Sequence, residues 1–450
     1  MDPMTLAEVA AVTGGRATGG EPAAPVTGVA LDSREAAPGD LFIALPGARA
    51  DGHDFAADAA ARGAVAVLGS RPVAELPTVV VPDPAAALAA LGAEARRRSP
   101  AAVVAVTGSN GKTSVKEILA AILGGVGTTL ATAGTRNNRL GVPATLCRLG
   151  SEHDYAVIEL GANHAGEIAE LAGMARPDAG VVTNAAPAHL EGFGSLDGVA
   201  AAKGELFSAL PEHGVAVINA DDAYAGYWRE LAGARRCLTF GAGSGQIRYR
   251  GSARRLELDL GAGWSAVPTA LLGAHNAANA AAAAAAACAL DVPAAAIIAG
   301  VEAATAPAGR LQLRAGCHGG WLVDDTYNAN PGSLRAALDV LPELGGEPWL
   351  LLGDMSELGE SAADWHRRAG EMARAAGVQR LCAVGPEAAA AAEGFGPGGE
   401  AFADQDALLS ACRTGLPASA VVLIKGSRSA AMDRVADALA IHANEAGEAS

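Results

Sequence analysis

The segment from residue 102 to residue 123 constrains the fold most, because an apolar, β-branched run leads into a helix through a glycine-rich turn. Two glycines permit tight backbone geometry that aims N–H groups at phosphate oxygens, and the helix start adds partial positive charge. The pattern predicts a phosphate-binding loop (P-loop) between a strand and a helix of an α/β domain. The loop residues are Thr107, Gly108, Ser109, Asn110, Gly111, Lys112 and Thr113.

Within this loop we expect Lys112 to contact the β- and γ-phosphates of a nucleoside triphosphate and the Thr113 hydroxyl to ligate Mg²⁺. The loop is shorter than the pattern GxxxxGK[ST], because Val106 stands where the first glycine is expected. The alternative is a glycine-rich turn that binds no ligand. The motif alone does not separate a GTPase, a kinase, a motor and a ligase, although the sequence has no Asn-Lys-x-Asp guanine signature.

The chain has 450 residues, which is more than one hydrophobic core usually supports. Short apolar runs alternate with helical stretches, which is typical of parallel sheets covered on both faces. We predict three α/β domains: a small N-terminal substrate domain (1–83), a central P-loop parallel-sheet ATPase domain (84–309) and a C-terminal Rossmann-like domain (310–450). We expect antiparallel or irregular structure in 235–267. The expected strands are 64–68, 78–81, 102–106, 155–160, 180–183, 215–219, 321–324, 349–352, 381–384 and 421–424.

The charge balance limits the partners that this chain can bind. A net charge of −16 and a sequence pI near 5.0 disfavour nucleic acid or an anionic membrane as the main partner. The six cysteines lack zinc-site spacing, which indicates reduced thiols in a cytosol. No signal peptide begins the chain, and the apolar run 277–290 is too short to span a bilayer. We therefore expect a cytoplasmic protein without membrane insertion, and we expect it to act as a monomer.

The loop sequence TGSNGKTS resembles the loops of Mur ligases and folylpolyglutamate synthetases. An ordered set of further segments is similar to the Mur ligases that add D-alanyl-D-alanine to UDP-N-acetylmuramoyl-tripeptide, and it covers nearly the whole chain. One departure is Thr135, where this family usually has Asn, with Arg136 as a further local change. The segments are TAG at 132–134, NN at 137–138, GVP at 141–143, IELGANH at 158–164, AHLEGFGS at 188–195, KGELF at 203–207, HNAANA at 275–280, DDTYNANP at 324–331, LGDM at 352–355, ELG at 357–359 and KGSRSAAM at 425–432.

The resemblance implies an ATP-dependent ligase that uses Mg²⁺, with two ions expected. Thr113 and Glu159 are the expected Mg²⁺ contacts, and Glu159 ends a predicted strand, where open parallel sheets place ligands. The family also implies that His189 ligates metal through a neutral imidazole. It implies a carbamylated Lys203, whose carbamate would ligate the second ion. Without the resemblance, these three side chains would be a capping carboxylate, a structural histidine and a surface charge.

The same resemblance assigns residues to the nucleotide. Asn276 and Asn279 are expected near adenine, since an amide offers both donors and acceptors; the alternative is capping or core amides. Arg310 is expected to clamp the γ-phosphate when the domains close, which makes it a catalytic candidate with Lys112, Glu159, His189 and Lys203. Asp325 is the expected ribose contact, with Tyr327 and Asn328 beside it at the nucleotide.

Three groups of residues are expected at the other substrates. Ser33 and Arg34 are expected at the UDP end, and Asn137 and Asn138 at the substrate in the central domain. The third group is expected to hold the dipeptide carboxylate, although a structural role fits it nearly as well. This group consists of Lys425, Ser427 and Arg428.

The predicted reaction has two steps. The tripeptide carboxylate attacks the γ-phosphate to form an acyl phosphate and ADP, and the amine of D-alanyl-D-alanine then displaces phosphate through a tetrahedral intermediate. Positioning and electrostatics would supply most of the catalysis. One alternative is another amide ligase of the superfamily, either a different Mur ligase or folylpolyglutamate synthetase. The other is a nucleotide-binding switch or scaffold that forms no amide.

Overall fold

The computed structural model describes residues 1–47, 50–187, 190–252 and 254–441. The chain divides into two compact units, which are treated separately below. The first contains residues 1–248 and 280–301, and the second contains residues 249–279 and those from 302 onward. No helix in the described ranges is long and apolar enough to cross a membrane.

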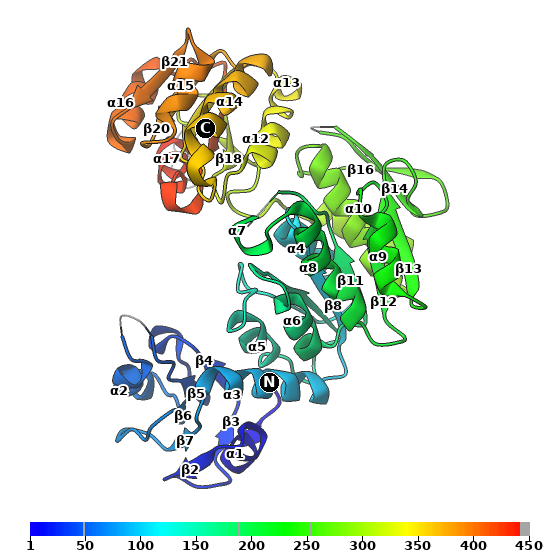
Figure 1. Cartoon of the computed structure of the whole chain (residues 1–450), viewed down its shortest axis with the longest axis vertical. Coiled ribbons are helices and arrows are strands. Elements are labelled where there is room, and N and C mark those ends of the chain that lie inside the picture. The colour runs from blue at the N-terminus through cyan, green and yellow to red at the C-terminus, as the bar shows by residue number, and fades with distance from the viewer. Residues whose placement is uncertain (48–49, 188–189, 253, 442–450) are drawn as a thin grey trace, which may run out of the picture. The chain divides into compact units, whose positions relative to one another are not determined.

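The N-terminal part of the first unit is a five-stranded sheet of order β2-β7-β6-β5-β4, parallel except for β2 (Figure 1). A two-stranded ribbon of β1 and β3 lies beside helix α1. The strands are β1 (Met4–Thr5), β2 (Arg16–Thr18), β3 (Pro25–Val26), β4 (Gly28–Ala30), β5 (Asp40–Ile43), β6 (Ala66–Gly69) and β7 (Thr78–Val80). The helices are α1 (Leu6–Thr13), η1 (Ser33–Glu35), η2 (Gly52–Phe55) and α2 (Ala56–Ala61).

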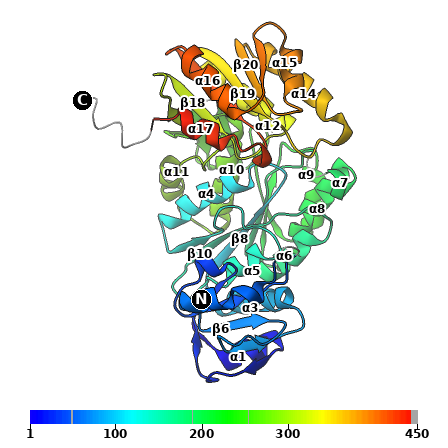
Figure 2. The ribbon, with the colours of Figure 1, turned by 90° about the vertical axis from the view of Figure 1, so that its left-hand side faces the viewer.

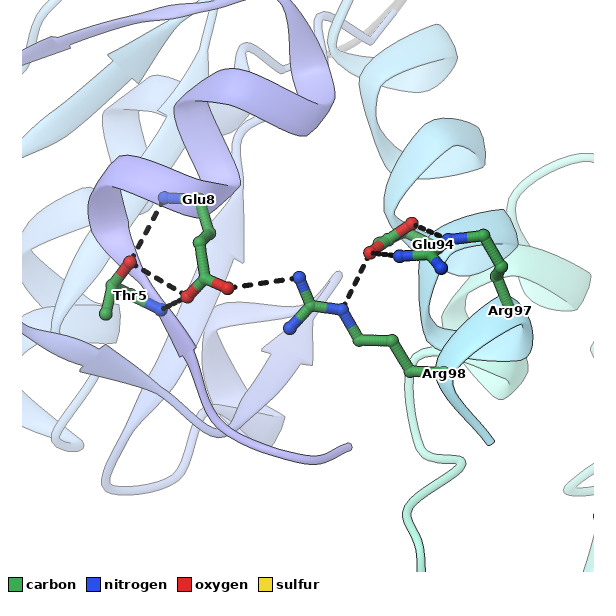
Figure 3. Close-up of polar contacts among 5 residues, drawn as sticks. All are labelled: Thr5, Glu8, Glu94, Arg97 and Arg98. Carbon is green, nitrogen blue, oxygen red and sulfur yellow. Dashed lines mark hydrogen bonds and ion pairs between the residues drawn. The ribbon is translucent and has the colours of Figure 1, made fainter. Parts of the chain in front are cut away.

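Helix α3 (Pro84–Arg98) leads from this sheet to the central one. It begins where the Asp83 carboxylate accepts the N–H groups of Ala85 and Ala86 and where Pro84 supplies a helical φ. Figure 3 shows how α3 is tied to α1: Arg98 bridges Glu8 at 3.1 Å and Glu94 at 2.7 Å. Glu8 also closes a capping box with Thr5, and hydrogen bonds from Arg97 and Arg98 lower the pKa of Glu94 to about 2.

The parallel part of the central sheet has the order β14-β13-β12-β11-β8-β10-β9. Val103 and Ala105 pack with α6, α8 and α9, while α4 and α11 lie on the opposite side of β8 and β10 (Figure 2). The strands are β8 (Ala102–Thr107), β9 (Thr129–Ala131), β10 (Tyr155–Glu159), β11 (Ala179–Val182), β12 (Val215–Asn219), β13 (Arg236–Gly241) and β14 (Ile247–Gly251). The helices are α4 (Lys112–Gly124), α5 (Gly141–Leu146), α6 (Glu167–Ala175), α7 (Leu190–Phe193), α8 (Leu196–Ala209), α9 (Ala225–Ala232), α10 (Ala274–Ala289) and α11 (Ala294–Ala303).

The expectation of antiparallel or irregular structure in 235–267 is wrong for its first half. Strands β13 and β14 extend the parallel sheet, because the buried side chains of Leu238, Phe240 and Ile247 add to its core. The expectation is confirmed for β15 (Leu256–Asp259) and β16 (Trp264–Val267), which form an antiparallel hairpin.

The sheet of the second unit has the order β17-β18-β22-β19-β20-β21, and only β17 is antiparallel. Leu350 and Leu352 face α12, α14 and α15, whereas Leu351 faces α16 and α17, so both faces are covered (Figure 2). The strands are β17 (Gln312–Ala315), β18 (Trp321–Asp325), β19 (Glu347–Gly353), β20 (Arg380–Val384), β21 (Gly399–Phe402) and β22 (Ala420–Lys425). The helices are α12 (Pro331–Leu338), α13 (Leu341–Leu344), η3 (Gly359–Ser361), α14 (Ala362–Ala375), α15 (Ala389–Phe395), α16 (Gln405–Gly415), η4 (Arg428–Ala430) and α17 (Asp433–Leu439).

Candidate active site

The glycine-rich turn has the backbone geometry that its sequence predicts. It joins the end of β8 to the start of α4, and both of its glycines have positive φ, 141° at Gly108 and 84° at Gly111. A Cβ at Gly108 would collide with the Thr183 hydroxyl. Gly111 is the N-cap residue of α4 and has no side chain that could cover the N-terminus of the helix, which lies directly after the loop. This is the arrangement in which a turn and a helix start together bind phosphate.

The end of the neighbouring strand β11 holds the loop in place. Thr183 donates its hydroxyl to the Asn110 carbonyl at 2.6 Å. The Asn184 side chain accepts the Asn110 N–H at 3.1 Å and donates to the Asn110 carbonyl at 3.2 Å. Lys112 donates its ammonium to the carbonyls of Gly108 and Ser109 at 2.7 and 3.1 Å, so its charge lies over the loop. The loop is therefore braced from a strand about seventy residues away in sequence.

The Glu159 carboxylate lies at the same edge of the sheet, at the end of β10, and is 1% exposed. Its Oε1 accepts the Asn137 amide at 2.7 Å, and its backbone N–H donates to the Thr132 hydroxyl at 3.0 Å. Its Oε2 is buried without a hydrogen-bond partner among the described residues. A buried carboxylate oxygen left without a donor is costly unless a cation pairs with it.

This carboxylate fits a magnesium site. Thr113, the other predicted Mg²⁺ ligand, lies buried in the first turn of α4. Three or more His, Cys, Asp or Glu side chains do not gather into a metal-binding group anywhere in the described part of the chain. A site with only the Glu159 carboxylate and the Thr113 hydroxyl as protein ligands suits Mg²⁺, because this ion uses one or two protein oxygens and completes its shell with phosphate oxygens and water.

Lys203 is buried rather than at the surface, with 3% of its area exposed. Its ammonium lies 5.1 Å from the centroid of the Phe193 ring and donates to the Ala162 carbonyl at 3.4 Å. Burial, followed by the positive charge of Lys112, lowers its pKa to about 7. Burial in this position therefore favours the neutral, nucleophilic form of the amine over the charged form. The predicted metal ligand His189 lies outside the described residues.

The remaining predicted substrate residues of the first unit have local partners. The Asn138 side chain accepts the N–H groups of Leu140 and Gly141 at the start of α5. Ser33 is buried, whereas Arg34 is exposed and pairs with Asp32 at 2.6 Å. Hydrogen bonds from Arg34 lower the pKa of Asp32 to about 2.

In the second unit, the structure brings Asp325 and Lys425 together. Lys425 is 1% exposed, forms an ion pair with Asp325 and donates to the Asn328 carbonyl at 2.9 Å. The Asp325 carboxylate also accepts the Leu311 N–H at 3.2 Å. The Arg310 guanidinium stacks on the Tyr327 ring, 4.3 Å from its centroid. Five of the predicted nucleotide and substrate residues thus take part in these contacts around the end of β18.

The other predicted residues of the second unit contact one another or neighbouring groups. The Asn276 amide donates to the Leu272 carbonyl at 2.8 Å, and the Asn279 amide donates to the Asn276 side chain at 2.9 Å. Ser427 is buried and exchanges hydrogen bonds with the hydroxyls of Ser356 and Ser429. The exposed Arg428 pairs with Asp433 at 3.2 Å.

Family models match three parts of the chain in order. The model described as Mur ligase family, catalytic domain, matches residues 25–126, the Mur ligase middle domain matches 106–287, and the Mur ligase, glutamate ligase domain matches 309–428. The chain belongs to the Mur ligase family. The expected three-domain α/β fold of a Mur ligase is thereby confirmed.

Relatives of this Mur ligase are similar along their whole length. The UDP-N-acetylmuramoyl-tripeptide–D-alanyl-D-alanine ligase of Escherichia coli is 45% identical over 449 residues, covering 98% of this chain and 99% of that protein. The structure of MurF from Acinetobacter baumannii matches with a TM-score of 0.89 and 37% identity, covering 97% and 99% of the two chains. MurF ligase from Thermotoga maritima in complex with ADP matches with a TM-score of 0.79 and 27% identity, covering 92% and 97%.

The loop geometry predicts that Gly108→Ala weakens ATP binding by this Mur ligase about 10- to 100-fold, because the new methyl group meets the Thr183 hydroxyl at a φ that favours glycine. Titration calorimetry with ATP measures the change. Gly124→Ala is the matched control, since a Cβ there meets no atom within 4 Å. Equal ATP affinity in both variants and the wild type would contradict the assigned loop conformation.

Proposed function

We propose that this protein joins D-alanyl-D-alanine to UDP-N-acetylmuramoyl-tripeptide and converts ATP to ADP and phosphate. One observation carries the choice of substrates: the 45% identity to the Escherichia coli ligase of that name, along nearly all of both chains. The six cysteines are free thiols, as expected in the bacterial cytoplasm, where we place the reaction. We also propose that the protein acts as a monomer.

The proposed chemistry has to overcome repulsion between anions. The tripeptide carboxylate must approach a triphosphate on a protein whose own net charge is −16. Lys112, the start of α4 and a Mg²⁺ ion held by Thr113 and Glu159 would supply the local positive charge. Glu159 Oε2, which is buried and has no hydrogen-bond partner in the part of the chain that the structure describes, supports this assignment.

In the first proposed step, a carboxylate oxygen of the tripeptide attacks the γ-phosphorus, the bond to the β-phosphate oxygen breaks, and ADP leaves. Lys112 neutralises charge on the β- and γ-phosphates, and Arg310 contacts the γ-phosphate. In the second step, the dipeptide amine attacks the acyl carbon, loses a proton, and inorganic phosphate leaves. Exclusion of water protects the acyl phosphate until the amine arrives.

We propose that Lys203 reacts with CO₂ to form a carbamate, and that the carbamate, together with His189, holds a second Mg²⁺. The burial of Lys203 and its lowered pKa support this proposal, because only the neutral amine attacks CO₂. The adjacent positive charge of Lys112 would stabilise the resulting anion as well as disfavour the protonated amine.

The other residues receive roles by family likeness and by their contacts. We propose Asn276 and Asn279 near adenine, Tyr327 beside Arg310 at the nucleotide, and Asp325 at the ribose. Because Lys425 is buried against Asp325, we propose that it orients this acid for the nucleotide.

The UDP and peptide substrates complete the proposed assignments. We propose that Ser33 and Arg34 bind the UDP end and that Asn137 and Asn138 position the substrate within the central domain. Ser427 and Arg428 are proposed at the dipeptide carboxylate, since hydroxyl and guanidinium groups both donate to carboxylates.

We expect purified protein with ATP, Mg²⁺, the UDP-linked tripeptide and D-alanyl-D-alanine to give the pentapeptide product, detected by mass spectrometry. ADP release should depend on the dipeptide, with single amino acids supporting little turnover. Turnover with glutamate or another single amino acid in place of the dipeptide would instead indicate a different amide ligase of the superfamily. Nucleotide binding that no peptide precursor alters would indicate a nucleotide-binding protein that is not a ligase.

We expect ¹³C-bicarbonate to give a carbamate resonance in the NMR spectrum of the wild type that is strong at pH 8 and weak at pH 6. The sign follows from the pKa of Lys203 near 7: protonation below this pH removes the nucleophilic electron pair. Lys203→Ala should lack both the resonance and most of the activity. An active Lys203→Ala enzyme and a wild type without any bicarbonate effect would contradict the carbamate.

A further inference from the structure

Lys116 is a fully buried lysine that the chemistry above does not use. It lies on α4, one turn after Lys112, and 0% of its area is exposed. Its ammonium donates to the carbonyls of Thr132 and Gly134 at 2.8 and 3.1 Å and contacts the Glu117 carboxylate at 2.6 Å. An ammonium has three donors, so these contacts account for all of them.

The segment that Lys116 holds reaches Glu159 by two routes. The Thr132 hydroxyl accepts the Glu159 backbone N–H at 3.0 Å. Further along the same segment, the Asn137 amide donates to Glu159 Oε1 at 2.7 Å, and the Asn137 carbonyl accepts the Gly161 N–H at 2.8 Å. Both the backbone and the carboxylate of Glu159 are therefore fixed by a segment that is itself fixed to α4.

We propose that Lys116 is a positioning residue that ties the helix of the phosphate-binding loop to the Glu159 carboxylate. Through the segment from Thr132 to Asn137, it keeps Glu159 Oε2 at a constant place relative to Lys112 and the start of α4. The inference rests on the proposed function, in which Glu159 holds the cation that accompanies ATP.

The two carbonyl contacts require a hydrogen-bond donor here. Carbonyl oxygens only accept hydrogen bonds, so an acidic or apolar side chain at this position would leave the buried Thr132 carbonyl and the partly buried Gly134 carbonyl without this donor. Burying an ammonium is costly unless it is fully paired. The exposed Glu117 is the replaceable partner, because it lies at the surface and the two carbonyls are the groups that lead to Glu159.

The test compares Lys116→Met, which keeps the apolar stem, with two controls in the full-length protein. Glu117→Gln removes only the surface charge, and Ile118→Val removes one buried methylene group from the same helix while leaving the Lys116 side chain intact. In Lys116→Met, the amides of Glu159 and Gly161 should exchange hydrogen at least about 10-fold faster, measured without metal or nucleotide. The Mg²⁺ concentration for half-maximal ligase activity should rise about 10- to 100-fold. Both controls should resemble the wild type.

A double-mutant cycle separates positioning from general destabilisation. If Lys116 acts through Asn137, then Lys116→Met combined with Asn137→Ala should cost less than the two single effects added together. Full additivity, or unchanged amide exchange and Mg²⁺ dependence in Lys116→Met, would overturn the proposal.

A second variant covers the case in which Lys116→Met does not fold. Thr132→Val keeps the carbonyl that Lys116 binds and removes only the hydroxyl that accepts the Glu159 N–H. It should also raise the Mg²⁺ requirement, and an unchanged requirement would overturn the proposal. Absence of pentapeptide product from the wild type would refute the proposed function instead, and the exchange measurement would still decide whether Lys116 holds the Glu159 segment.

Discussion

The proposed site depends on the interaction of the buried Glu159 carboxylate with a cation. One of its oxygens is satisfied by Asn137, and the other is buried without a hydrogen-bond partner among the described residues. Such an arrangement is unfavourable by itself and becomes favourable when a cation is bound. The parallel sheet makes it possible, because β8 and β10 end side by side and place the phosphate-binding loop and the carboxylate at one edge.

The surroundings of this carboxylate are arranged to concentrate positive charge in an acidic protein. Lys112 lies over the loop, Lys116 is buried one turn further along α4, and Lys203 is buried near enough to Lys112 for their charges to interact. Each lysine is held by backbone carbonyl groups. Fixed cations of this kind need little reorganisation when a polyanionic substrate binds, which is the advantage of a preorganised site.

The sequence predicts the fold class and the phosphate-binding loop because both depend on local patterns. Apolar runs of strand length and a glycine-rich turn are visible within a few residues of one another. The prediction of antiparallel or irregular structure was wrong for β13 and β14. Such short strands have the same pattern of apolar residues in parallel and antiparallel sheets, and their pairing depends on residues far away in the sequence. Local sequence patterns therefore predicted the right architecture, except for the pairing of β13 and β14.

The parts of the site that sequence reasoning missed are held by contacts between distant residues. Thr183 and Asn184 brace Asn110 from more than seventy positions away, and their only local signal is that Thr183 ends a predicted strand and Asn184 follows it. From the sequence alone, Lys116 has the pattern of an ordinary charged residue on a helix surface, and the structure shows that it is buried.

The pairing of Lys425 with Asp325 spans 100 residues, so the motif around Lys425 could not show it. Motifs thus supply candidate residues, and the structure adds which of them are buried and which contact one another.

The most direct test is a crystal structure with Mn²⁺ in place of Mg²⁺ and a non-hydrolysable ATP analogue, with the metal located by anomalous scattering. The account predicts a metal peak about 2 Å from Glu159 Oε2, at the distance of a directly bound oxygen ligand, with the phosphates of the analogue in the loop from Thr107 to Thr113. A metal bound elsewhere, with Glu159 Oε2 hydrogen-bonded to protein or water, would contradict it.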